Sequence, residues 1–174
     1  MSLVEISNKT VMSFAFASDN NYAQHLCVAI ASLFDNLSQD VYPSVKILDG
    51  GISEENKENI NRLTFLRPAD IEFVDMKQYD FSDYKTTIDY ISVATYYRLK
   101  LPSLLPDIDR VIYLDCDLIV DKDISGLWNE CDDEKQVMAV ADLWGTYKDH
   151  HLKIGMKKES YYFNAGVILF NLKR

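Results

Sequence analysis

Short apolar runs alternate with stretches in which apolar residues recur at helical spacing. Residues 12–17 predict a buried strand, and the stretch after them predicts a helix with one apolar face formed by Leu26, Ile30, Leu33, Phe34 and Leu37. Further strands are expected at residues 45–48, 71–74, 111–114, 137–141 and 166–170. The chain therefore reads as strands separated by helices or loops.

Two more helices are expected between these strands. Ser53 precedes a charged stretch with apolar residues at Ile60, Leu63 and Leu66, which is typical of a helix that begins at a serine cap. A second helix is expected from Ser92 and should end at Pro102. The alternation predicts an α/β fold, a mostly parallel sheet with helices on both faces, whose ligands bind beyond the carboxyl ends of the strands.

The composition limits the classes of protein to which this chain can belong. The 174 residues, 48% of them hydrophobic, suffice for one domain, and no linker or repeat divides residues 1–174. A net charge of −9 disfavours nucleic acid as a partner, and no apolar run is long enough to predict a membrane span. Three cysteines without a C-x-x-C spacing suggest neither disulfides nor a zinc site, so we expect a cytoplasmic protein.

An acidic pair lies in the most apolar part of the chain. Asp115 and Asp117 are flanked by the apolar residues 111–114 and 118–120. Side chains two apart in an extended segment point the same way, so both carboxylates can bind one Mn²⁺ or Mg²⁺, with diphosphate oxygens completing the coordination. Two alternatives remain: a carboxylate pair that merely caps a strand end, and an aspartate nucleophile of a phosphatase.

Acids also follow other predicted strands. Asp19, Asp75, Asp115 and Asp142 each come after an apolar run, and in a parallel sheet they would gather at one edge. Next to the first of them, an amide and an aromatic ring, Asn21 and Tyr22, could bind a pyrimidine, although an Asx turn that caps a helix explains the segment equally well.

Two polar residues lie in otherwise aromatic or apolar surroundings. Arg98 could bind a phosphate or sugar oxygen, or lie on the surface with its stem against apolar neighbours. Asn164 could bond sugar hydroxyls where Ala165 and Gly166 let a ligand approach the backbone, or the segment could be a bulge before a strand. Neither pattern is specific by itself.

Together, residues 14–22, 48–56, 95–101, 113–117 and 162–167 resemble the retaining glycosyltransferases of family 8, especially bacterial lipopolysaccharide and lipooligosaccharide galactosyl- and glucosyltransferases. The resemblance implies a GT-A fold and a hexosyltransferase that uses UDP-galactose or UDP-glucose and a saccharide or glycolipid acceptor. A binding module of the same fold without turnover is the alternative. Retention of anomeric configuration is implied as well.

The resemblance also assigns roles to single residues. Mn²⁺ would bind Asp115 and Asp117, and catalytic roles fall to Arg98, Asp142 and Asn164. The implied contacts to the UDP-sugar are Ala17, Asp19, Asn21, Tyr22, Arg98, Asp115, Cys116, Asp117, Asn164, Ala165 and Gly166. His25, His150 and His151 are expected to be structural or solvated.

Members of this family continue well beyond the position of Arg174, so we expect a chain truncated at its C-terminus that holds the donor-binding part of the domain. Residues 166–172 should then lie near an edge exposed by the missing segment, where apolar surface favours self-association. The full-length protein is expected to lie at the inner membrane face as a peripheral protein.

Overall fold

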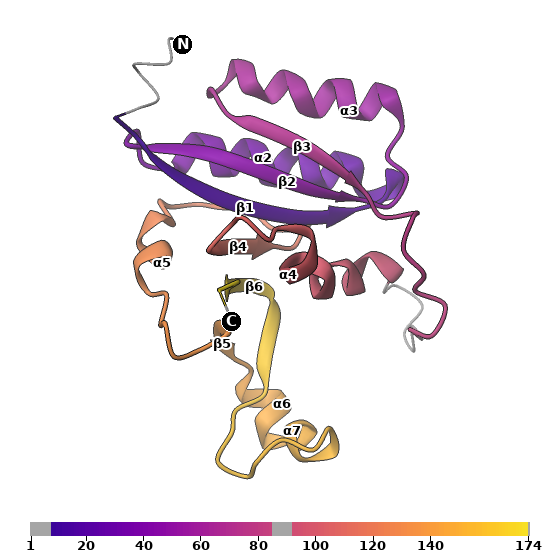
Figure 1. Ribbon diagram of the computed structural model, residues 1–174, viewed down its shortest axis with the longest axis vertical. Coiled ribbons are helices and arrows are strands. Elements are labelled where there is room, and N and C mark those ends of the chain that lie inside the picture. Colours follow the sequence, from indigo (N-terminus) through magenta and orange to yellow (C-terminus); the bar gives the residue numbers. More distant parts are fainter. Residues whose placement is uncertain (1–7, 85–91, 174) are drawn as a thin grey trace.

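The computed structural model describes residues 8–84 and 92–173, which form one six-stranded sheet in the order β3-β2-β1-β4-β6-β5 (Figure 1). The strands are β1 (Thr10–Ser18), β2 (Val41–Asp49), β3 (Asp70–Asp75), β4 (Arg110–Leu114), β5 (Val137–Ala141) and β6 (Phe163–Asn171). β1 pairs in parallel with β2 and β4, β2 pairs in parallel with β3, and β6 is antiparallel to β4 and β5. The predicted α/β fold with a mostly parallel sheet is confirmed.

The sheet is accompanied by short helices. The α-helices are α2 (Ala23–Asn36), α3 (Glu54–Asn61), α4 (Leu101–Leu104), α5 (Ser125–Asn129), α6 (Leu143–Tyr147) and α7 (His150–Lys153), and the 3₁₀ segments are η1 (Asn20–Tyr22), η2 (Arg62–Phe65) and η3 (Val93–Lys100). Ser53 caps α3 as predicted, since its Oγ accepts the N–H of Asn56 at 3.3 Å. The helix expected to reach Leu66 instead tightens into η2, a common ending for an α-helix.

The helix expected to end at Pro102 is different in the structure. Its first part is the 3₁₀ segment η3, and Pro102 lies in the first turn of α4 rather than after a helix. The first N–H groups of an α-helix have no intrahelical acceptor, so proline costs no hydrogen bond at this position. Pro102 therefore lies at the start of one helix, α4, and was expected to mark the end of another.

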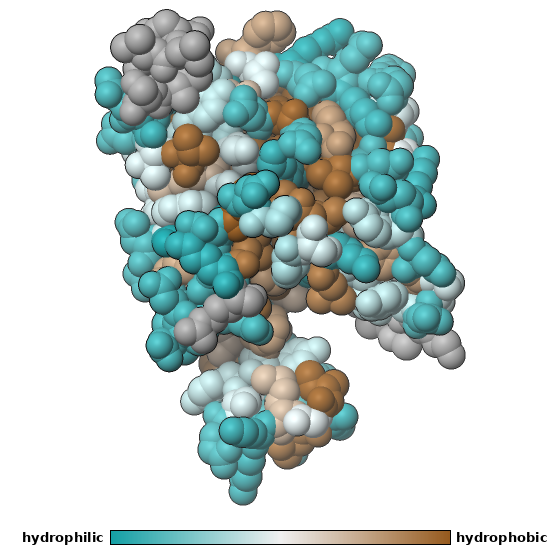
Figure 2. All heavy atoms as spheres, viewed as in Figure 1, coloured by the Kyte–Doolittle hydropathy of each residue, from teal (hydrophilic) through white to brown (hydrophobic). Residues whose placement is uncertain are grey.

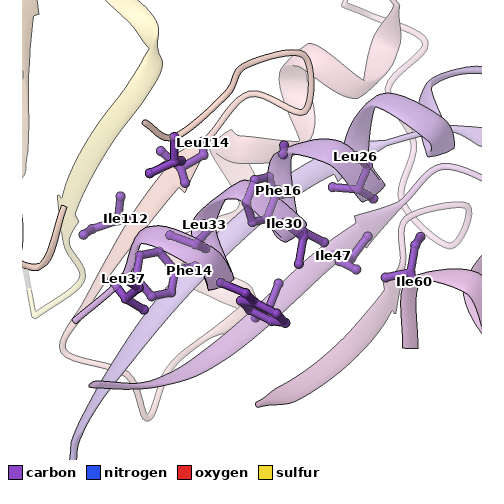
Figure 3. Close-up of a cluster of buried hydrophobic side chains, with 14 of the residues drawn as sticks. Phe14, Phe16, Leu26, Ile30, Leu33, Leu37, Ile47, Ile60, Ile112 and Leu114 are labelled. Carbon is purple, nitrogen blue, oxygen red and sulfur yellow. The ribbon is translucent and has the colours of Figure 1, made fainter. Parts of the chain in front are cut away.

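The alternation of side chains along β1 builds a core on each face of the sheet. Phe14 and Phe16 point toward α2, where they pack with Leu26, Ile30 and Leu33 (Figure 3). Ala15 and Ala17 face the other way and belong to a second buried cluster with residues of η3 and α4, including Tyr97 and Leu101. Helical segments thus cover both faces of the sheet. A ligand can therefore approach the sheet only at its edges and strand ends, such as the carboxyl ends of β1 and β4.

Residues 166–172 do not form an edge of the sheet. The chain turns back after α7, so β6 lies between β4 and β5 and its backbone is paired on both sides. On this side of the sheet the edge strand is β5, and beyond it the α6–α7 lobe projects from the sheet and carries exposed apolar side chains, among them Leu143, Trp144 and Tyr147 (Figures 1 and 2). Self-association stays a prediction, with this region as the exposed apolar surface.

Within residues 8–84 and 92–173, no helix combines the length and the hydropathy that crossing a bilayer requires.

Candidate functional site

A cavity of about 300 Å³ lies at the carboxyl ends of β1 and β4. It is lined by Ala17, Ser18, Asp19, Tyr22, Ser92, Ala94, Thr95, Arg98, Tyr113, Asp115, Cys116 and Asp117. Parallel pairing of β1 with β4, with Phe14 opposite Ile112, brings these distant segments together. Of the acids predicted to gather at one edge, Asp19 and Asp115 line this cavity, whereas Asp75 and Asp142 do not.

The segment after β1 is an Asx turn that also forms one wall of the cavity. Oδ1 of Asp19 accepts the N–H groups of Asn21 and Tyr22 at 2.9 and 3.2 Å and caps η1. The turn places the half-exposed Tyr22 ring against the cavity, with His25 packed on it at 5.2 Å between ring centroids. Asn21 is exposed and is absent from the lining, so the structure joins only part of the predicted uracil-binding group.

The loop after β2 supports this turn. Oδ1 of Asn20 accepts the N–H of Ser53 and Nδ2 of Asn56, both at 2.9 Å. Nearby, Asp49 is buried, which opposes ionisation, but hydrogen bonds from the N–H groups of Ile52 and Gly51 and the ion pair with Lys57 at 2.9 Å lower its pKa. Residues 48–56 therefore hold the cavity wall in place from behind.

One carboxylate oxygen of Asp115 accepts hydrogen bonds from the protein, and the other does not. Its Oδ1 accepts a hydrogen bond from Nη2 of Arg98 at 2.9 Å and another from the hydroxyl of Tyr113 at 3.0 Å. Its backbone N–H donates to the carbonyl of Gly166 at 2.8 Å. Oδ2 has no hydrogen-bond partner among the described residues, so this oxygen is available to a ligand.

Arg98 is a buried residue, so its interpretation as a surface arginine is wrong. It is 8% exposed, and its guanidinium lies 4.3 Å from the centre of the Tyr113 ring. Nε donates to the carbonyl of Thr95 at 2.7 Å, Nη2 to Thr95 Oγ1 at 3.0 Å and to Asp115, and Nη1 to the carbonyl of Ala165. Of its five N–H groups, one on Nη1 is left for a ligand.

Burial sets the protonation of two other residues at the cavity. It raises the pKa of Tyr113 well above the ordinary value despite the nearby charge of Arg98, so the hydroxyl stays protonated and donates to Asp115. Burial, with the charges of Asp117 and Asp115, raises the pKa of the Cys116 thiol to about 11. Cys116 is therefore a neutral thiol at physiological pH and is poorly suited to act as a nucleophile.

Asp115 and Asp117 could supply part of a set of metal ligands, although β4 ends at Leu114 and Asp117 lies in a turn rather than in the extended segment that was expected. No group of three or more His, Cys, Asp or Glu side chains placed to hold a metal occurs in residues 8–84 and 92–173. Asp117 is exposed at the cavity and Asp115 offers its open Oδ2. Mg²⁺-type ions commonly bind one or two carboxylates and complete their shell with water and phosphate oxygens, so this pair fits such an ion only together with a phosphate-bearing ligand.

Asp142 and Asn164 line a different hollow, of about 500 Å³, with Val140, Ala141, Leu143 and Val167. Asp142 caps α6 through a 2.9 Å bond from the N–H of Gly145, and Oδ1 of Asn164 accepts the N–H of Gly166 at 2.8 Å. Gly166 lies between this hollow and the cavity: a Cβ there would be 2.9 Å from Asp115 Oδ2 and 3.1 Å from Asn164 Oδ1.

The three histidines lie outside both linings. His25 packs on Tyr22, and His150 meets the edge of Tyr162 at 5.7 Å between ring centroids. His151 is buried, with an Nδ1 atom that has no hydrogen-bond partner in the described part of the chain. These placements agree with a structural role for His151 rather than with a cluster of metal ligands.

Sequence reasoning missed several residues that line the cavity: Ser18, Ser92, Ala94, Thr95 and Tyr113. Tyr113 had a signal in the sequence, because it lies two residues before Asp115 at the end of a strand and therefore faces the same side. Thr95 had none, because only the fold shows that its carbonyl and hydroxyl bind Arg98.

Comparison with known proteins places this geometry in a family. The model of glycosyl transferase family 8 matches residues 13–174. A Haemophilus influenzae protein that is provisionally named a glycosyltransferase is 35% identical over 164 residues, which cover 94% of this chain and 49% of that protein. General stress protein A of Bacillus subtilis is 32% identical over 168 residues, covering 94% of this chain and 57% of that protein.

Solved structures agree with this assignment. The galactosyltransferase LgtC, solved in complex with donor and acceptor sugar analogues, has a TM-score of 0.84 and 39% identity, covering 93% of this chain and 58% of that chain. The bifunctional glycosyltransferase WbbM shares the fold with a TM-score of 0.79 at 24% identity. The chain spans about half the length of the curated relatives described above. It belongs to glycosyl transferase family 8 and has the GT-A fold.

Proposed function

We propose that this chain transfers galactose or glucose from a UDP-sugar to a saccharide or glycolipid acceptor, with a divalent metal and with retention of configuration. The observation that carries the proposal is that the wall formed by Asp19 and Tyr22 and the acidic pair Asp115 and Asp117 share one cavity. An aromatic ring and hydrogen-bonding groups suit a uracil, and a metal-binding pair suits a diphosphate. Family membership and the similarity to LgtC support hexosyl transfer.

Different residues of the chain bind different parts of the UDP-sugar donor. Tyr22 stacks on the uracil, Asp19 bonds its edge, and Ala17 and Cys116 contact the nucleotide through their main chains. Asn21, which lies outside the cavity lining, would bond the uracil edge only after turning toward the cavity. Oδ2 of Asp115 and the carboxylate of Asp117 would hold Mn²⁺ or Mg²⁺, which would supply positive charge to offset that of the diphosphate leaving group.

Arg98 acts on the leaving group mainly through its charge. It lies at the cavity but has only one free N–H, so it adds positive potential near the diphosphate and a single hydrogen bond rather than a two-pronged grip. The same guanidinium binds both Asp115 and the Ala165 carbonyl. It thereby ties the metal-binding carboxylate to the segment that we assign to the donor sugar.

The sugar and acceptor lie on the side of Gly166. Asn164, Ala165 and Gly166 border the transferred hexose, and Asp142, in the neighbouring hollow, faces the acceptor. The bond between the anomeric carbon and the diphosphate breaks, an acceptor hydroxyl attacks the same face, and its proton passes to the departing UDP oxygen. A glycolipid acceptor would place the whole protein at the inner face of the membrane.

The test is a calorimetric titration of UDP into the purified chain with and without Mn²⁺, followed by transfer and hydrolysis assays with UDP-galactose and UDP-glucose. We expect UDP affinity to rise with Mn²⁺ and one of the two sugars to be consumed. Metal-dependent binding without consumption would identify a binding module. Absence of UDP binding in both conditions would contradict the donor site.

Exchange of Gly166 for alanine should disturb the metal-binding carboxylate. The new Cβ would lie 2.9 Å from Asp115 Oδ2, too close for the carboxylate to stay in place. Overpacking of this kind costs about 1–3 kcal/mol, so we expect UDP affinity in Mn²⁺ to fall about tenfold or more. Gly126→Ala is the matched control, because a Cβ at Gly126 meets no atom within 4 Å. Equal UDP affinities for the two variants would refute this steric argument.

A further inference from the structure

Tyr113 contacts Asp115, the first residue of the acidic pair. It is 1% exposed at the end of β4, its hydroxyl donates to Oδ1 of Asp115 at 3.0 Å, and its ring supports the Arg98 guanidinium at 4.3 Å. β4 ends at Leu114, and Asp115, the next residue, is held beside β6 by its N–H bond to the Gly166 carbonyl at 2.8 Å, so its side chain meets Tyr113 two residues earlier.

The arrangement restricts how the carboxylate can turn. The terminal torsion of an aspartate is broad and poorly fixed by the side chain itself. In this site two donors, Arg98 Nη2 and the Tyr113 hydroxyl, bind the same oxygen, Oδ1. Arg98 is in turn held by Thr95 and by the Ala165 carbonyl. Oδ2 is therefore kept open and directed away from both donors.

We propose that Tyr113 is a positioning residue: its hydroxyl and ring together orient Asp115 so that Oδ2 is presented to the cation that accompanies the donor diphosphate. This inference rests on the proposed function, since it assigns the open oxygen to a metal. Tyr113 does not touch the substrate in this proposal. It acts through Asp115 and Arg98.

The test compares two matched Tyr→Phe variants. Tyr113→Phe removes the hydroxyl and keeps the ring against Arg98. Tyr42→Phe is the control, because Tyr42 is also buried and its hydroxyl also donates to a carboxylate, Asp70 Oδ1, at 3.0 Å, but it lies on β2 and outside the cavity lining. UDP is titrated into each variant and into the unsubstituted chain, with and without Mn²⁺, and thermal unfolding is recorded for all three.

We expect Tyr113→Phe to lower UDP affinity in Mn²⁺ about tenfold, because one of the two hydrogen bonds that fix Oδ1 of Asp115 is lost while that of Arg98 remains. The metal-free affinity should stay unchanged, because the effect passes through the oxygen that is presented to the cation. Tyr42→Phe should change neither affinity. Unchanged affinity of Tyr113→Phe in Mn²⁺ would overturn the proposal, and so would an equal loss with and without Mn²⁺, which indicates a merely structural role.

Failure of the proposed function gives a different result. If Mn²⁺ does not raise the UDP affinity of the unsubstituted chain, the metal site itself is refuted and the positioning role is refuted with it. If Mn²⁺ raises that affinity and Tyr113→Phe behaves like the unsubstituted chain, the donor site stands and only the role of Tyr113 is wrong.

Discussion

Exchange of Asp115 for asparagine should remove the Mn²⁺-dependent part of UDP binding and with it any sugar transfer. The amide is neutral and turns an NH₂ group or a weakly basic oxygen toward the cation, whereas a hard divalent ion needs the carboxylate. The variant also leaves the guanidinium of Arg98, which is 8% exposed, without its ionic partner. Removing a residue that only supports a metal ligand typically lowers metal affinity or activity about 10–100-fold. We therefore expect the removal of a ligand itself to lower UDP affinity in Mn²⁺ by roughly 100-fold or more.

The measurement is the calorimetric titration of UDP at saturating and zero Mn²⁺, with sugar transfer assayed in parallel. Asp121→Asn is the control, because Asp121 is exposed, lies outside the cavity lining and loses the same unit of charge. If Asp115→Asn binds UDP in Mn²⁺ as tightly as Asp121→Asn, the carboxylate does not hold a metal. A loss of UDP affinity that is the same without Mn²⁺ would instead point to collapse of the cavity around Arg98.

The sequence predicted the parts of this site that depend on local pattern. The apolar runs located all six strands, and because β1 and β4 are parallel, the acids that follow them converge. It did not predict which strands are neighbours. Asp142 follows β5, but β6 is inserted between β4 and β5, so Asp142 lies in a separate hollow. Asp75 is the last residue of β3, which is separated from β1 by β2. Strand order is decided by packing between distant segments, which a single apolar run does not record.

The local sequence pattern also could not identify residues whose hydrogen-bond partners lie in other segments of the chain. Arg98 was singled out as a residue for a ligand, yet most of its donors bind Thr95, Asp115 and the Ala165 carbonyl. Thr95 precedes Arg98 by three residues in η3, but Asp115 and Ala165 come from distant segments, so no spacing in the sequence could reveal those two partners. The site roles implied by the family resemblance stay predictions, and the fold shows which of those residues contact one another.

Arg67 is another residue whose partners are backbone groups of other segments. Its replacement by methionine should lower the free energy of unfolding by about 3–5 kcal/mol. It is 5% exposed and donates to carbonyls at the end of α2, in the turn after it and at the first residue of β2: Phe34 at 3.2 Å, Leu37 at 2.6 Å, Ser38, and Val41 at 2.8 Å. The last carbonyls of a helix lack intrahelical partners and carry partial negative charge, so a buried cation satisfies both needs.

Methionine keeps the apolar stem of Arg67 and removes only the charged donors, so the loss measures the hydrogen bonds rather than a cavity. Burial lowers the pKa of Arg67, but an arginine so well bonded stays charged at any pH at which the chain is folded. Arg62→Met is the control, because Arg62 is exposed and makes a single 3.3 Å bond to Asn59, and it should change stability by about 0.5 kcal/mol or less. Urea unfolding with equal slopes should show a clearly lower midpoint for Arg67→Met alone. Equal midpoints would mean that water satisfies these carbonyls once the guanidinium is gone, and that the turn between α2 and β2 is held by its own backbone.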